Sequence, residues 1–153
     1  MRFALAPTMM AMVACSTTQT SSGQLTSFSQ SPEQCVEPCD GWNGYKATLD
    51  STGHIAMRSM IGSGMAVGTL TQLGSGQLAT MIDVLPIDAD AGEGSGVTMA
   101  LDIDFADGGP RSYAVPVDNP GFFGGLTVFL TDVATSMADG EQSALVTAVV
   151  ETD

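Results

Sequence analysis

Apolar and polar side chains alternate along residues 97–105. The apolar set consists of Val97, Met99, Leu101, Ile103 and Phe105. Successive side chains of a β-strand point to opposite faces, so this alternation predicts a strand with one buried and one solvated face. Asp102 and Asp104 lie on the solvated face, and the turn-forming stretch 106–110 ends the strand.

Similar but shorter apolar runs, separated by Gly, Asp and Pro, occupy most of the remaining chain. Including the first, the expected strands are 45–49, 55–57, 65–73, 78–87, 97–105, 113–117, 126–130 and 144–150. No window of helical length shows a convincing 3.6-residue stripe. The best helical candidate, residues 127–138, is rich in β-branched side chains and fits a strand at least as well. About eight strands with tight connections predict an all-β fold, either an antiparallel β-sandwich or a small up-and-down barrel.

The N-terminal segment, MRFALAPTMMAMVAC, combines a single charge at Arg2 with an apolar run that is too short to span a bilayer. Such a run is typical of a secretory signal. Residues 12–15, Met-Val-Ala-Cys, resemble the lipobox of bacterial lipoproteins, in which cleavage falls before the Cys and the Cys carries lipid. The resemblance implies a signal peptide at 1–14 and a lipidated Cys15, and Ser16 after it implies transfer to the outer membrane. An ordinary signal peptide and an N-terminal helix packed on the domain are the alternatives.

Ser, Thr, Gln and Gly dominate residues 16–34, in which no periodicity is visible. This composition is typical of a flexible linker. We therefore expect residues 15–34 to form a tether between the lipidated Cys15 and a single β domain at 35–153. This organisation predicts a location in the cell envelope, where the N-terminal lipid holds the protein at the membrane.

Two further cysteines, Cys35 and Cys39, stand at the start of the expected domain. If Cys15 carries lipid, they form an even pair in an oxidising compartment, which predicts a disulfide. The closed loop is small, so its stabilising effect is about 2 kcal/mol, and its role is to fix the turn where tether and domain meet. The alternative is a redox or copper pair, but the chain lacks the helix–strand alternation needed for a thioredoxin-like fold.

The charge balance excludes one class of partner. The chain carries 17 acidic residues against four Lys and Arg, which gives a net charge of −13. Nucleic-acid binding depends on clustered Lys and Arg that release counterions, so we expect no nucleic-acid partner. Adhesion to an anionic membrane through a basic patch is disfavoured for the same reason. Beyond the leader, the bases are Lys46, Arg58 and Arg111.

Acidic residues gather in two places. Asp88, Asp90 and Glu93 lie in a Gly-rich loop, and Asp102 and Asp104 share one face of the expected strand. Ca²⁺ binds about 6–8 hard oxygen atoms from carboxylates and backbone carbonyls, so these five residues are candidate Ca²⁺ ligands, and no other cofactor is expected. The alternative is a solvated acidic surface that keeps a β protein soluble and discourages pairing of strand edges.

The sequence contains a single histidine, His54, which follows a turn glycine at the start of an expected strand. We interpret it as an exposed turn residue. Met57 and Met60 lie close by, and thioether and imidazole ligands suit Cu(I). On a regular strand, however, His54 and Met60 share a face while Met57 points away, so core filling is the expected role of the methionines.

No arrangement of residues for catalysis stands out. No G-x-S-x-G motif surrounds any serine, and no carboxylate pair is singled out as a glycosidase would require. We therefore expect a non-catalytic envelope lipoprotein whose β domain has a binding or structural role, with another envelope protein as its partner. The alternatives are a domain that binds Ca²⁺ or, less readily, Cu(I), and a carboxylate-dependent hydrolase.

Overall fold

The computed structural model describes residues 22–34, 36, 42–85, 96–106 and 108–151. Within them the strands are β1 (Gly23–Gln30), β2 (Tyr45–Leu49), β3 (His54–Ser59), β4 (Met65–Leu70), β5 (Thr98–Phe105), β6 (Gly109–Pro116) and β7 (Val146–Glu151). The helices are α1 (Gln72–Asp83) and α2 (Gly124–Asp139), with short 3-10 turns η1 (Pro32–Gln34) and η2 (Gly121–Phe123).

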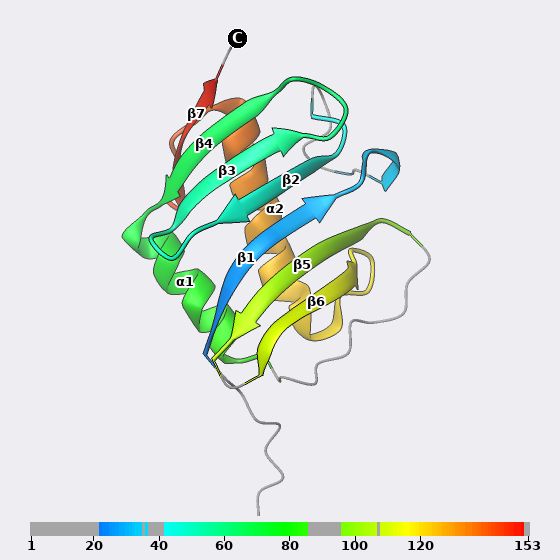
Figure 1. Cartoon of the computed structure of the whole chain (residues 1–153), viewed down its shortest axis with the longest axis vertical. Coiled ribbons are helices and arrows are strands. Elements are labelled where there is room, and N and C mark those ends of the chain that lie inside the picture. Colours follow the sequence, from blue (N-terminus) through cyan, green and yellow to red (C-terminus); the bar gives the residue numbers. More distant parts are fainter. Residues whose placement is uncertain (1–21, 35, 37–41, 86–95, 107, 152–153) are drawn as a thin grey trace, which may run out of the picture.

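All seven described strands belong to one sheet with the order β6-β5-β1-β2-β3-β4-β7, and every pair is antiparallel. The expected antiparallel, all-β architecture is therefore confirmed in the sheet. The second layer consists of α1 and α2, which lie behind the sheet in the view of Figure 1. The two helices contact each other, and α2 packs most closely on β7 while α1 packs on β1.

The core lies between the sheet and the helices, because every second strand residue faces the helices. In β5 these residues are Met99, Leu101, Ile103 and Phe105, each at most 2% exposed. The alternation that predicted this strand therefore marks its buried face correctly. Phe28 and Tyr45 pack edge to face at the centre of the sheet, with ring centroids 6.0 Å apart.

The prediction of a strand at 78–87 is wrong, because residues 72–83 form α1. Thr71 caps this helix: its hydroxyl oxygen accepts a hydrogen bond of 3.0 Å from the Gly74 amide. Gly74, Leu78 and Ile82 lie four residues apart and form the buried face. Burial of this stripe against the sheet outweighs the low helix propensity of the glycines in the segment.

The prediction of a strand at 126–130 is also wrong, because these residues lie in α2. The buried side of α2 consists of Leu126, Thr127, Phe129, Leu130, Val133, Ala134 and Met137. Gly140, whose φ of 64° is left-handed, ends the helix. By length and composition residues 121–139 could cross a membrane. In this fold one side of α2 is buried in the core, while Val128 on the other side is 63% exposed.

The prediction of a flexible tether over 15–34 is wrong for its second half. Residues 23–30 form β1, the third strand from one edge, which pairs with both β2 and β5. Leu25 and Phe28 are each 1% exposed, and these apolar residues within a polar segment carry the strand into the core. The folded domain therefore begins before residue 35. Residues 1–21, and with them the predicted signal peptide and Cys15, lie outside the described residues.

Candidate functional site

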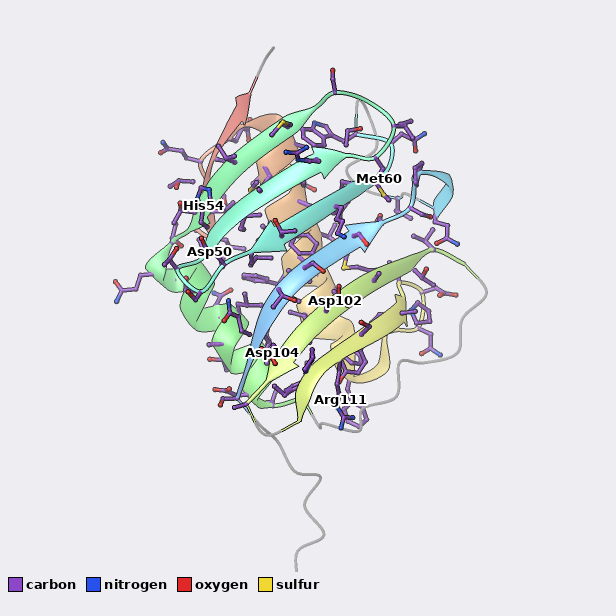
Figure 2. All side chains as sticks on the ribbon, viewed as in Figure 1. Asp50, His54, Met60, Asp102, Asp104 and Arg111 are labelled. Atoms are coloured by element: carbon purple, nitrogen blue, oxygen red, sulfur yellow. The ribbon has the colours of Figure 1, made fainter. Side chains whose placement is uncertain are left out.

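One face of the sheet is not covered by the helices, and we refer to it as the open face (Figure 2). Its side chains alternate along each strand with the buried ones. In the middle of the sheet they are Ser27, Ser29, Lys46, Thr48, Ala56, Arg58, Ala100 and Asp102. Most of them are short Ser, Thr and Ala side chains. The charged side chains among them are Lys46, Arg58 and Asp102.

Asp102 is held in place by hydroxyl groups from both neighbouring strands. Ser27 of β1 donates a hydrogen bond of 2.6 Å to Oδ2, and Ser112 of β6 donates one to Oδ1. The register between β1 and β5 shifts at this point, because Leu25 pairs with Ile103 while Ser27 pairs with Asp102. The carboxylate therefore joins three strands at a β-bulge, which is a structural role.

The charge of Asp102 is stabilised by the same contacts. The hydrogen bond from Ser112 and then that from Ser27 hold its pKa below the usual value, and the positive charge of Lys46 acts in the same direction. Partial burial opposes these effects. Asp102 is therefore a carboxylate at neutral pH and not a proton donor.

Lys46 and Arg58 lie directly opposite each other on β2 and β3. Both side chains are exposed, and neither forms a salt bridge or hydrogen bond with a residue that the structure describes. Ser29 of β1 is opposite Lys46 on its other side, and Met65 of β4 is opposite Arg58. Two like charges in direct cross-strand register destabilise a sheet, and the attraction between Lys46 and the Asp102 carboxylate offsets part of this repulsion. The pair is still a basic spot on a chain of net charge −13.

The candidate Ca²⁺ ligands are only partly described. Asp88, Asp90 and Glu93 lie outside the described residues. Asp102 and Asp104 share the open face, as expected, and Asp104 is exposed. Among the residues that the structure describes, no three His, Cys, Asp or Glu side chains are grouped so that they could hold a metal ion. The Ca²⁺ site therefore stays a prediction.

The residues considered for Cu(I) do not come together. His54 and Met60 lie toward opposite ends of β3 in Figure 2. Met57 is fully buried on the covered face, where it fills the core as expected. His54 is exposed, as expected, and it directly follows the turn as the first residue of β3. Cys35 and Cys39, for which a disulfide or a redox pair was considered, lie outside the described residues.

Asp50 organises the turn before His54. Its Oδ1 accepts hydrogen bonds from the Thr52 hydroxyl, the Thr52 amide and the His54 amide, at 2.7, 2.9 and 3.0 Å. These contacts, with the Thr52 hydroxyl first, hold the pKa of Asp50 below its usual value. Gly53 adopts the left-handed φ of 83° that completes the turn. All these contacts are local, so they indicate a turn and not a catalytic acid.

A cavity of about 250 Å³ opens between α1 and the β2–β3 turn. Its apolar wall includes Leu25, Leu49 and Leu78, while Asp50 and Ser75 line it with polar atoms. Ligand pockets are usually about 300–1,000 Å³ in volume. The cavity is thus smaller than a usual ligand site, and no described group in it is arranged for chemistry.

Comparisons with protein-family models, with curated proteins and with solved structures find no match to this chain.

The pairing of Lys46 with Arg58 was missed in the sequence, although a signal for it exists. Gly53 is the last residue of a three-residue loop, 51–53. Asp50 and His54, which flank the loop, pair directly, and the Asp50 amide donates a hydrogen bond of 3.0 Å to the His54 carbonyl. This loop length fixes the register of the hairpin and brings residue 46 opposite residue 58. A loop one residue longer would have placed the two bases on opposite faces.

Proposed function

We propose that this protein is a non-catalytic binding domain, held at the cell envelope by a lipid on Cys15, which recognises a partner through the open face. The observation that carries the proposal is the exposed basic pair, Lys46 and Arg58, in direct register at the middle of that face. A carboxylate bound between the two side chains would relieve their mutual repulsion. Arg is well suited to this role because its guanidinium can donate two parallel hydrogen bonds to a carboxylate.

The partner that fits this surface is a protein that presents acidic side chains. The Ser, Thr and Ala side chains around the pair lose little conformational entropy when they are covered, which favours a broad contact. An anionic membrane surface fits less well, because such surfaces are recognised by clusters of about 4–8 Lys and Arg, whereas the basic group proposed on this face is one Lys–Arg pair. At physiological salt, charges are screened beyond about 8 Å, so the local pair can still attract a carboxylate.

A synthetic polyglutamate peptide provides a direct test. We expect the protein to bind it with chemical-shift changes centred on β2 and β3, and with an affinity that falls as NaCl rises. Arg58→Ala should weaken binding about tenfold or more, because a hydrogen bond to a charged group contributes about 1.5–3 kcal/mol. Lys46→Ala should have a smaller effect, because its ammonium group binds as a point charge.

Arg111→Ala is the matched control, because it removes the same charge from β6, at a position that pairs with the buried Ile103 and not on the open face. Binding should be unchanged by this substitution. Equal losses in Arg58→Ala and Arg111→Ala would reduce the effect to net charge and overturn the proposed site. Binding to inorganic phosphate or to phosphatidylglycerol vesicles, with none to the peptide, would point to a different partner.

The envelope anchor is tested separately, by growth with a palmitate analogue. The full chain should become labelled, and Cys15→Ser should abolish the label and release the protein from the membrane fraction. Failure of this test would remove the anchor but leave recognition through Lys46 and Arg58 intact.

A further inference from the structure

The two edges of the sheet are not equivalent. The Val117 amide donates a hydrogen bond of 2.8 Å to the Val97 carbonyl, so residues 97 and 117 form a hydrogen-bonded pair. In an antiparallel ladder every second pair is hydrogen-bonded, so the backbone groups of odd-numbered residues in β6 bond to β5 and those of even-numbered residues point outward. Pro110 and Pro116 therefore fall on outward-facing positions of β6, where they remove the N–H groups that another strand would need. In a two-fold pairing of β6 with itself, centred on residue 113, Pro110 of each copy would face Pro116 of the other.

The opposite edge, β7, contains no proline, and its first five residues carry no charge. The Thr71 amide donates a hydrogen bond of 2.9 Å to the Leu145 carbonyl, so these two residues form a hydrogen-bonded pair next to the β4–β7 ladder. From there, every second pair of residues along the ladder is hydrogen-bonded. By this alternation, Thr147, Val149 and Glu151 bond to β4. The backbone groups of Val146, Ala148 and Val150 point outward, away from the sheet.

The first outward-facing residue is already satisfied within the chain. The Ser143 amide donates a hydrogen bond of 2.9 Å to the Val146 carbonyl, and the Val146 amide donates one of 3.2 Å to the Ser143 hydroxyl. In this strand as the structure describes it, Ala148 and Val150 therefore keep outward backbone groups to which no neighbouring strand is paired. They are two residues apart, which is the spacing of bonded pairs in an antiparallel ladder.

We propose that β7 pairs antiparallel with β7 of a second copy of this chain, in the register that places Val149 opposite Val149. In this register Ala148 of each copy is opposite Val150 of the other, and the two outward pairs form four backbone hydrogen bonds. The bonds from Ser143 to Val146 stay in place. Glu151 lies opposite Thr147 of the second copy, so no like charges meet.

The symmetry has a consequence for the open face. The two-fold axis runs perpendicular to the sheet through Val149, so both open faces point the same way. The dimer would present two Lys46–Arg58 pairs on one continuous surface, although the pairing itself does not depend on what they bind. Because each copy carries a net charge of −13, their repulsion should make the dimer tighter as NaCl rises. Binding of an acidic partner should show the opposite salt dependence.

Sedimentation equilibrium of the full chain tests this, with Cys15→Ala in every variant so that no lipid contributes. We expect a monomer–dimer equilibrium that shifts toward dimer in high salt. Val149→Lys and Val149→Glu should each raise the dimer dissociation constant about fivefold or more, because like charges would lie directly opposite. An equimolar mixture of the two should restore dimerisation as a heterodimer. Simple loss of folding in either variant cannot produce this rescue.

Thr147→Lys is the matched control on the same strand and face. It places a lysine opposite Glu151 of the second copy, so the dimer should be as tight as before or tighter. Val150→Pro removes an outward N–H without breaking a bond to β4 and should abolish the dimer. A wild-type chain that stays monomeric in high salt at millimolar concentration would overturn the proposal. So would a dimer that Val149→Lys and Val150→Pro leave unchanged.

Discussion

Two glycines in the first half of α1 lie two residues apart in different surroundings, which permits a matched test of the fold. A Cβ on Gly74 would overlap the carbonyl oxygen of Leu145 and lie 3.0 Å from its carbonyl carbon. A Cβ on Gly76 would meet nothing within 4 Å. The same substitution, Gly→Ala, should therefore change stability in opposite directions at the two positions.

The magnitudes follow from competing effects. Replacement of Gly by Ala within a helix stabilises it by about 0.8–1 kcal/mol, and Gly76→Ala should gain this amount. At Gly74 the same gain is opposed by overpacking, which costs about 1–3 kcal/mol. The Leu145 carbonyl also accepts the 2.9 Å hydrogen bond from the Thr71 amide, so its displacement loses about a further 1 kcal/mol. The net expectation for Gly74→Ala is a loss of about 1–3 kcal/mol.

Urea unfolding of both variants, followed by circular dichroism, provides the free energies of unfolding. For a domain of this size a change of 1 kcal/mol moves the melting temperature by about 4 °C, so thermal melts should agree in sign. A Gly74→Ala variant at least as stable as the wild type would refute the close packing of α1 against the segment before β7. A destabilised Gly76→Ala would refute the open surroundings of that position.

Two further predictions concern side chains on the sheet. The hydroxyl of Tyr45 is buried, and no hydrogen-bond partner for it is found among the described residues. Tyr45→Phe should therefore stabilise the fold by about 1 kcal/mol in the same urea assay. A loss of stability would show that the hydroxyl has a partner. The pKa of Asp102 is lowered in the folded state, so its contribution is complete above the unfolded value of about 3.9 and is lost as the pH falls below it. Asp102→Asn should therefore lower stability at pH 7 and weaken its decline between about pH 5 and 2.

The strands were predictable where one face is buried and the other solvated. Residues 97–105 and the hairpin of 45–49 with 55–57 follow this rule, and the structure has strands there. In β1 the same rule is weakened by the bulge between Leu25 and Ser27, which breaks the alternation of apolar residues. The surrounding Ser, Thr and Gln residues then made this central strand resemble a linker.

The helices could not be predicted from local propensity. In α1 two glycines lower the intrinsic stability of the helix, and in α2 the β-branched residues Thr127, Val128 and Val133 favour a strand. Both segments are helical because each buries an apolar stripe against a sheet whose strands come from distant parts of the chain. Gly74 also lets α1 approach the Leu145 backbone closely, a constraint that has no local signal.

The antiparallel β character and the buried faces of β2, β3 and β5 could be inferred from the sequence, because they depend on neighbours two residues apart. The acidic net charge, and with it the expectation of no nucleic-acid partner, also came from composition alone. The tertiary structure decided that α1 and α2 cover one face, that β1 is central and that Lys46 meets Arg58 across a hairpin. These features depend on contacts between residues far apart in the chain, whose energies compete with local preference and in this protein exceed it.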